Sequence, residues 1–190
     1  MATQRQPEFI TPEEYLESQR TAEVRSEYIS GEMYEMSAAS KEHSQILHAL
    51  SVEVGNALKN KPCEGGVALA VRARASYLVP DLVIYCDGGD FTDQDEVLHD
   101  PVVIFEVLSP STADFDHGHK WILYQQLPSL KHYVMIAQDR PHVEIYSRES
   151  ENGWHYEAFS SPDVVIRLPY VDIELSLAAL YERVSFDDHP

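Results

Sequence analysis

Three residues that together could act on a phosphate ester occur in order along the 190-residue chain: Asp81, Glu106 and Lys120. Pro80 precedes Asp81 and removes one donor from a strand's hydrogen-bond ladder. We therefore expect the strand to start, bulge or kink there and to aim Asp81 out of the sheet. A local turn made by the Asp81 side chain is an equally open interpretation. Lys120 is expected on a helix, where a lysine taken alone is usually a solvated surface charge.

Glu106 lies in the run PVVIFEVLS at 101–109, which is apolar, rich in β-branched residues and too short for a helix. The pattern predicts a central strand buried on both faces. An ionised carboxylate in such a strand is costly unless a positive group meets it. One interpretation is a structural ion pair with Arg72 or Arg74. The other is a functional carboxylate, because strongly perturbed ionisable groups cluster at functional sites.

The predicted placement favours the second interpretation. A strand, a tight turn and a helix would bring Lys120 back towards the end of the Glu106 strand, with Tyr124 one turn further on the same helix face. Two carboxylates and a backbone carbonyl are hard oxygen ligands that suit Mg²⁺ or Mn²⁺. Such an ion lowers the pKa of a bound water and neutralises charge on a phosphoryl oxygen, and a nearby lysine can orient that water.

The rest of the sequence predicts one α+β domain over residues 1–190 with a mixed sheet. Thr11 and Glu14 form the signature of a helix start, and Ser30-Gly31 is the expected turn of a hairpin. Further helices are expected at 40–58, 116–127 and 176–184. Strands are expected at 67–75, 77–86, 101–109, 131–138, 142–147, 154–159 and 164–168, with a turn-rich break at 59–66.

Composition narrows the function. Fourteen basic against 32 acidic residues give a formal charge of −18, which argues against tight sequence-independent binding of nucleic acid by the monomer but leaves a local basic groove open. No apolar stretch is long enough to span a bilayer, and the N-terminus lacks a signal-peptide pattern, so we expect a cytoplasmic protein. Cys63 and Cys86 have no metal-binding spacing and are expected to be reduced thiols. His43 is either a satisfied, half-buried histidine or a ligand.

The order of these residues resembles the Uma2 family, also called DUF820, which belongs to the PD-(D/E)XK nuclease-like superfamily. The resemblance rests on Val-Pro-Asp81, on the block Phe-Glu106-Val-Leu-Ser-Pro-Ser-Thr112, and on Lys120 with Tyr124. It extends upstream to 28–36 and His43, and downstream to 128–134 and 139–144. It therefore covers nearly the whole chain.

The resemblance implies a restriction-endonuclease-like mixed β-sheet flanked by helices, with an extra N-terminal hairpin and C-terminal strands. The superfamily motif would place a lysine where this chain has Leu108, and a hydrocarbon cannot replace an ammonium. The resemblance implies that the lysine has moved to Lys120. It also makes Glu32 a candidate outer acidic residue, for which an exposed hairpin charge is the alternative.

The leading hypothesis is a divalent-metal-dependent endonuclease that hydrolyses phosphodiester bonds in nucleic acid, with DNA as the expected substrate. Asp81, Glu106 and the Val107 carbonyl would hold Mg²⁺ or Mn²⁺, Lys120 would position the attacking water, and Glu32 would assist. Two alternatives stay open: an inactive nuclease-like binding or scaffold module, and a metal-dependent hydrolase of a smaller phosphoester. A homodimer is expected because two subunits could form a groove for duplex.

Overall fold

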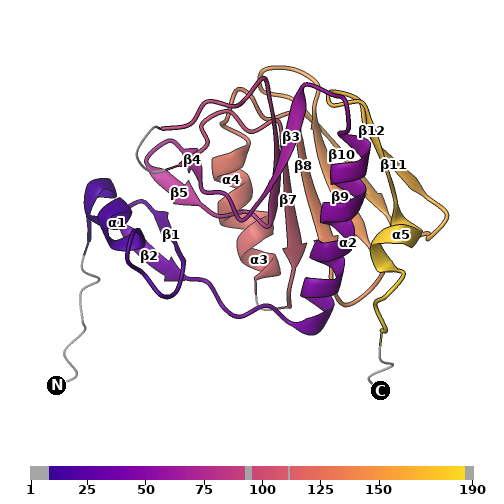
Figure 1. Ribbon diagram of the computed structural model, residues 1–190, viewed down its shortest axis with the longest axis horizontal. Helices are drawn as coiled ribbons and strands as arrows, with labels where there is room; N and C mark the ends of the chain where they lie inside the picture. Colours follow the sequence, from indigo (N-terminus) through magenta and orange to yellow (C-terminus); the bar gives the residue numbers. More distant parts are fainter. Residues whose placement is uncertain (1–8, 93–95, 111, 187–190) are drawn as a thin grey trace.

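The computed structural model describes residues 9–92, 96–110 and 112–186, and its main feature is a mixed sheet (Figure 1). Its strand order is β10-β9-β8-β7-β6-β3. Strands β7 and β8 are parallel, and the other neighbours pair antiparallel. The strands are β3 (Cys63–Val67), β6 (Leu82–Cys86), β7 (Val103–Leu108), β8 (His132–Ala137), β9 (Val143–Arg148) and β10 (Trp154–Phe159).

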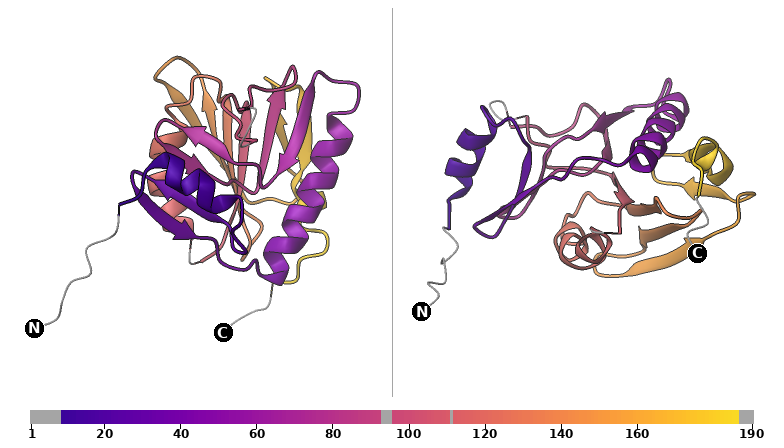
Figure 2. Two further views of the ribbon diagram at one scale, coloured as in Figure 1. Left: turned by 60° about the vertical axis from the view of Figure 1, so that its left-hand side comes forward. Right: turned by 90° about the horizontal axis from the view of Figure 1, so that it is seen from below.

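Strand β7 lies inside this sheet, between β6 and β8, and all six of its residues are buried. The prediction of a strand buried on both faces is confirmed. On one face Phe105 and Val107 pack against α2 (Lys41–Ala57), α5 (Leu177–Tyr181) and the hairpin of β11 (Val165–Leu168) and β12 (Ile173–Ser176). On the other face Ile104 and Leu108 pack with residues of α4 (Trp121–Tyr124). Figure 2 shows these two helical layers on opposite sides of the sheet.

The N-terminal hairpin and residues 71–78 form a smaller sheet beside the large one, with the order β2-β1-β5-β4. Helix α1 (Pro12–Gln19) begins with the predicted capping box of Thr11 and Glu14. Ser30 and Gly31 both have positive φ, as the tight turn of a two-residue hairpin requires. These residues confirm the predicted hairpin. The strands are β1 (Ser26–Ile29), β2 (Glu32–Glu35), β4 (Val71–Ala73) and β5 (Ser76–Leu78).

Helix α2 confirms the helix predicted at 40–58, and it is capped by Ser40, whose side chain accepts from the His43 amide. Its apolar face buries Ile46, Leu50 and Val54 against the large sheet. Such a stripe at helical spacing is what holds a helix on a sheet, because most helix stability in proteins comes from this packing. One end of α2 therefore brings His43 close to the start of β6.

Several local predictions are wrong. In place of the turn-rich break at 59–66, strand β3 begins at Cys63, and the expected strand at 67–75 is interrupted at Ala68, which has positive φ. Cys63 and Cys86 are not thiols but form a disulfide. They lie directly opposite each other in the β3–β6 register, a neighbourhood that their spacing in the sequence does not reveal. Strand β12 is an element that the sequence pattern did not predict.

In place of the helix predicted at 116–127, three short helical pieces follow one another over 113–124. Residues Ala113–Phe115 form α3, Asp116–Lys120 form a π-helical turn called η1, and Trp121–Tyr124 form α4. In η1 the Trp121 amide donates to the Asp116 carbonyl, five residues back. Ser111, which belongs to the predicted turn before this segment, lies outside the described residues. Within the described ranges, none of the helices has the length and apolarity needed to cross a membrane.

Candidate active site

Glu106 and Lys120 meet in the interior, as predicted. The Lys120 ammonium nitrogen lies 3.1 Å from Glu106 Oε1, and both side chains are buried. The Tyr124 hydroxyl donates to the same oxygen at 3.1 Å. The alternative pairing with Arg72 or Arg74 is wrong, because both arginines are exposed and Arg72 donates to the Arg74 carbonyl. The positive partner of Glu106 is therefore Lys120.

Two further carboxylates share the Lys120 ammonium, and neither was predicted. Glu27 Oε1 lies 3.0 Å from Lys120 Nζ and also accepts from the Val79 amide. Asp116 Oδ1 lies 3.2 Å from Lys120 Nζ, four residues earlier in the same segment. This spacing was a sequence signal, because residues four apart face each other on a helix. Glu27 carried no such signal, because it lies on a strand of the small sheet that is far from Lys120 in the sequence.

Asp81 stands in the connection between β5 and β6 and bridges three elements. Its Oδ2 accepts from the Val107 amide in β7 at 2.7 Å, and its Oδ1 lies 3.0 Å from His43 Nε2 in α2. Both partners are distant in the sequence, so these contacts do not correspond to the local-turn interpretation. The Pro80-Asp81 interruption does separate β5 from β6, as expected. Asp81 thus lies next to the residue that follows Glu106.

The site carries more negative than positive charge. Burial raises the pKa of Glu106 despite the opposing effect of Lys120, and burial also raises the pKa of Asp116. For Lys120, burial favours the neutral form, but Glu106, Glu27 and Asp116 outweigh it and raise the pKa. The ammonium therefore keeps its proton. Three carboxylates surround it, and the charge of a fourth, Asp81, acts on Glu106 and Asp116.

His43 is a half-buried histidine with a definite partner. Burial lowers its pKa, but the Asp81 hydrogen bond and charge, together with the Val107 backbone, raise it overall. The expectation of a satisfied histidine is confirmed. The contribution of the Val107 backbone also indicates that the His43 ring, Asp81 and Val107 lie together.

The chemistry of the oxygen donors fits a hard divalent cation. Each Asp81 oxygen makes one hydrogen bond or ion pair, which leaves it further acceptor capacity. Glu106 Oε1 accepts hydrogen bonds from Lys120 and Tyr124, while Oε2 makes no hydrogen bond within the described residues. These donors and the Val107 carbonyl could hold Mg²⁺ or Mn²⁺, with waters completing the coordination. No group of three or more His, Cys, Asp or Glu suited to a metal occurs in the part of the chain described here. The predicted ligand set has only two such side chains.

Glu32 lies on β2, where it accepts a hydrogen bond from the Tyr34 hydroxyl at 2.7 Å. Among the described residues, no hydrogen bond or ion pair joins it to the buried carboxylates. Its role as an outer acidic residue stays a prediction.

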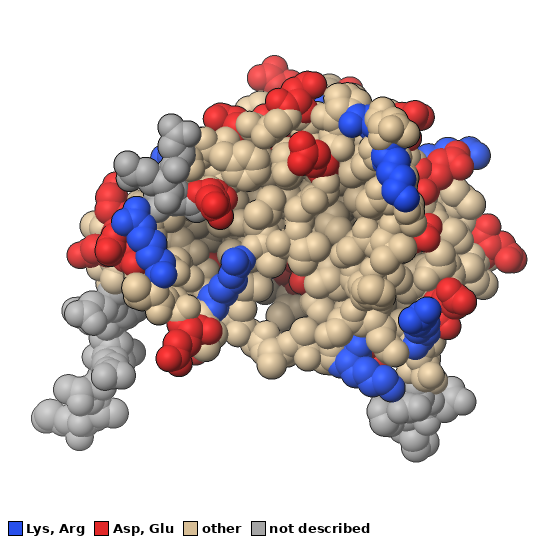
Figure 3. Space-filling view, viewed as in Figure 1, with Lys and Arg blue, Asp and Glu red and all other residues tan. Residues whose placement is uncertain are grey.

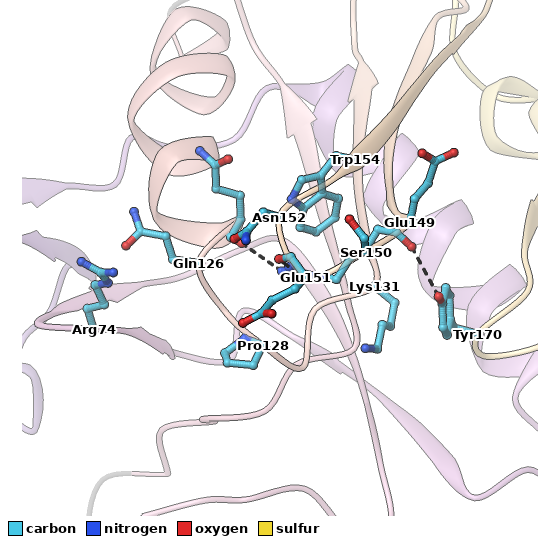
Figure 4. Close-up of a pocket in the computed structure, with 12 residues that line it drawn as sticks. Arg74, Gln126, Pro128, Lys131, Glu149, Ser150, Glu151, Asn152, Trp154 and Tyr170 are labelled. Atoms are coloured by element: carbon cyan, nitrogen blue, oxygen red, sulfur yellow. Dashed lines mark hydrogen bonds between the residues drawn. The ribbon is translucent and has the colours of Figure 1, made fainter.

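The surface around the site is hollowed. Figure 3 shows a recess in the lower middle of the molecule, where α3 and the end of β7 lie in Figure 1, and acidic side chains are visible inside it. A separate cavity of about 470 Å³ lies where β8 begins and β9 ends (Figure 4). It is lined by Arg74, Lys131, Trp154 and Tyr170 among others, and it contains none of the four carboxylates. We place the candidate active site at the carboxylates and not at this cavity, because the side chains that could hold a cation lie at the carboxylates.

The mixed sheet and its flanking helices define a nuclease-like α+β fold. A solved structure from Anabaena variabilis, described as "a putative nuclease belonging to DUF820", superposes with a TM-score of 0.76 at 21% identity. The match covers 93% of this chain and 99% of the other. At this identity it shows the fold alone, and it confirms the predicted restriction-endonuclease-like architecture.

The chain belongs to the Uma2 family, whose model is described as "Putative restriction endonuclease" and matches residues 12–179. Two uncharacterised proteins of Synechocystis sp., slr1290 and sll1609, are similar over most of their length. The first is 30% identical over 93% of this chain and 94% of its own. The second is 28% identical over 87% and 96%, respectively.

Proposed function

We propose that the protein is a divalent-metal-dependent endonuclease that hydrolyses phosphodiester bonds of nucleic acid, with DNA as its substrate. The observation that carries the proposal is the convergence of Asp81, Glu106 and Lys120 at the end of β7 in a member of the Uma2 family. The nuclease description of the solved relative supports this activity, and the surplus of buried negative charge supports a cation.

In this proposal the side chains divide the work. Asp81, Glu106 and the Val107 carbonyl would hold the ion, and the ion would lower the pKa of a water and neutralise charge on the phosphate. Asp81 is held in place by the Val107 amide and His43. Glu106 is held by Tyr124 and Lys120.

Lys120 has three N–H donors and three carboxylate partners within 3.2 Å. Its ammonium therefore stabilises negative charge at the site electrostatically. It can donate directly to water or phosphate only when one of the three contacts opens. Glu32 would act from the edge of the site.

The test is cleavage of supercoiled plasmid and single-stranded DNA with Mg²⁺, with Mn²⁺ and with a chelator. Asp81→Asn and Glu106→Gln should each lower the rate by about 100-fold or more, because each removes a ligand charge. Glu157→Gln, which changes an exposed carboxylate on β10, is the matched control and should keep full activity. Equal activity in the wild type and all three variants would refute the assignment.

A second candidate is a binding or scaffold module without catalysis. Two observations favour it: Leu108 occupies the position of the motif lysine, and every donor of Lys120 is engaged. Calorimetry separates the candidates, because a nuclease of this type must bind Mg²⁺ or Mn²⁺ at millimolar concentration and the module need not. The homodimer stays a prediction, which sedimentation analysis would test.

A further inference from the structure

A second group of titratable residues lies on the same face of the sheet as Glu106. The strand register places Glu106 opposite Met135, and Met135 opposite Glu144. Residues paired in this way share a face, and two strand spacings separate Glu106 from Glu144 by about 10 Å. Glu144 is therefore a near neighbour of the candidate active site, although the proposed mechanism does not use it.

The ring of His117 bridges η1 to Glu144. Its Nδ1 lies 2.7 Å from the Ala113 carbonyl oxygen, and its Nε2 lies 3.0 Å from Glu144 Oε1. A carbonyl and a carboxylate can only accept hydrogen bonds, so both ring nitrogens must donate. A histidine that donates from both nitrogens is an imidazolium. The geometry thus requires a positive charge on His117.

The surroundings of this ion pair come from three elements. On β9 and β10, Glu144 Oε2 accepts from the Tyr156 hydroxyl at 2.9 Å. From the turn before β9, His142 Nε2 lies 3.5 Å from Glu144 Oε1. On its own turn, His117 follows Asp116, whose negative charge also favours the protonated ring.

The direction of titration agrees with this geometry. Burial lowers the pKa of His117, but Glu144, the Ala113 carbonyl and Asp116 outweigh it and raise the pKa. Burial raises the pKa of Glu144, but His117 and Tyr156 outweigh it and lower the pKa. Both shifts favour the charged pair near neutral pH.

The pair is placed where it can control Lys120. Residue 117 lies within the five-residue turn η1, which begins with Asp116 and ends with Lys120. Other contacts hold this turn to the sheet: the ammonium pairs of Lys120 and a hydrogen bond from the Tyr133 hydroxyl to the Asp116 carbonyl. After loss of the His117 proton, one ring nitrogen would carry no hydrogen while still facing an acceptor. The hydrogen bond at that nitrogen would be lost.

We propose that His117 is a positioning residue: held as an imidazolium by Glu144, it fixes the η1 turn that presents Asp116 and Lys120, and loss of its proton loosens that turn. Because the proton is lost as the pH rises, the turn is firm at acid and neutral pH and loosens at alkaline pH. The effect on cleavage rests on the proposed nuclease function, but the effect on η1 does not.

The test is NMR on the whole chain, following the ring signals of each histidine and the backbone amides of 116–120 between pH 5 and 9. We expect the His117 ring to titrate above 6.5 and the amides of η1 to change with the same midpoint. Glu144→Gln should move that midpoint to lower pH. At pH 8, amide exchange in η1 should be about tenfold faster than at pH 6 after correction for intrinsic exchange.

Two variants serve as controls. His117→Gln should remove the transition of the η1 amides at the His117 midpoint, because an amide side chain does not titrate in this range. His142→Gln changes the other histidine beside Glu144 and should keep the His117 titration and its coupling to η1. If cleavage is observed, its alkaline loss should follow the His117 midpoint in the wild type and in Glu144→Gln.

A His117 ring that titrates below 6.5 in the wild type would overturn the proposal, as would η1 amides that do not follow it. These readouts need no catalytic activity. A protein that cleaves no DNA but shows the coupled titration would refute the nuclease and keep the positioning role. A protein that cleaves DNA without the coupled titration would support the nuclease and refute the positioning role.

Discussion

Replacing Lys120 with methionine would remove the ammonium that three buried carboxylates share, while keeping most of the side-chain volume. The ammonium nitrogen lies 3.0, 3.1 and 3.2 Å from oxygens of Glu27, Glu106 and Asp116. At an effective dielectric constant of ~20, each contact corresponds to roughly 5 kcal/mol of attraction. The desolvation of the ions offsets most of this sum. Removal of one partner from a buried ion pair costs about 3–5 kcal/mol, and we expect that loss of unfolding free energy at pH 7.

The loss should depend on pH in a defined direction. Burial raises the pKa values of Glu106 and Asp116 in the folded protein, so protonation at lower pH stabilises the folded state relative to the unfolded state. Without the ammonium these carboxyls gain more from protonation. The difference between the wild type and Lys120→Met should therefore be largest at neutral pH and shrink as the pH falls towards 5.

The assay is urea unfolding without divalent metal, followed by circular dichroism at several pH values. Lys131→Met is the matched control, because the Lys131 ammonium lies over the Tyr170 ring at the surface cavity and has no buried carboxylate partner among the described residues. It should change stability by less than about 1 kcal/mol. An unchanged urea midpoint in Lys120→Met would show that the ammonium does not balance the buried carboxylates, and the electrostatic argument for the site would fail.

Two further predictions concern the scaffold. Burial lowers the pKa of His132 from 6.5 to about 4. Its contribution to the free energy of unfolding is therefore present above pH 6.5 and falls by up to about 3 kcal/mol as the pH decreases to 4. Urea unfolding of His132→Gln should show less acid destabilisation than the wild type, and equal acid sensitivity would contradict this. Reduction of the Cys63–Cys86 disulfide, which joins residues 23 apart, should lower the unfolding free energy by about 3 kcal/mol, with the Cys63→Ala, Cys86→Ala protein as the control for the reducing agent. Two free thiols in the unreduced, denatured protein would exclude the bridge.

Several features of the site were accessible from the sequence because they depend on local patterns. A short β-branched run with one acid predicted a buried strand and a positively charged partner for that acid. A turn followed by a helix predicted that Lys120 would return to Glu106. The family resemblance assigned the same lysine independently. The structure confirms the contact and adds the Tyr124 hydroxyl, on the helix face that the spacing predicted.

The features that the sequence did not predict share a cause, which is contact between elements far apart in the chain. The sequence around Glu27 indicates only a hairpin, and nothing near it indicates that Lys120 will lie 3.0 Å away. The glycines that follow Cys63 suggest a turn more than an edge strand, and so hide the start of β3. His117 falls at the start of the helix predicted at 116–127, and the sequence does not indicate its partner, because Glu144 comes from a strand two positions away from β7 in the sheet.

Local sequence patterns were enough to specify the strand that carries Glu106, the caps of the first helices, the hairpin turn and the candidate pair of Glu106 with Lys120. These follow from side-chain periodicity and backbone preference, which act over a few residues. The three-dimensional arrangement was needed to establish that Glu27 and Asp116 share the same ammonium, that Asp81 is held by His43 and the Val107 amide, and that the two cysteines meet. Periodicity specifies which face of a strand is buried, but strand order and register specify which residues meet there.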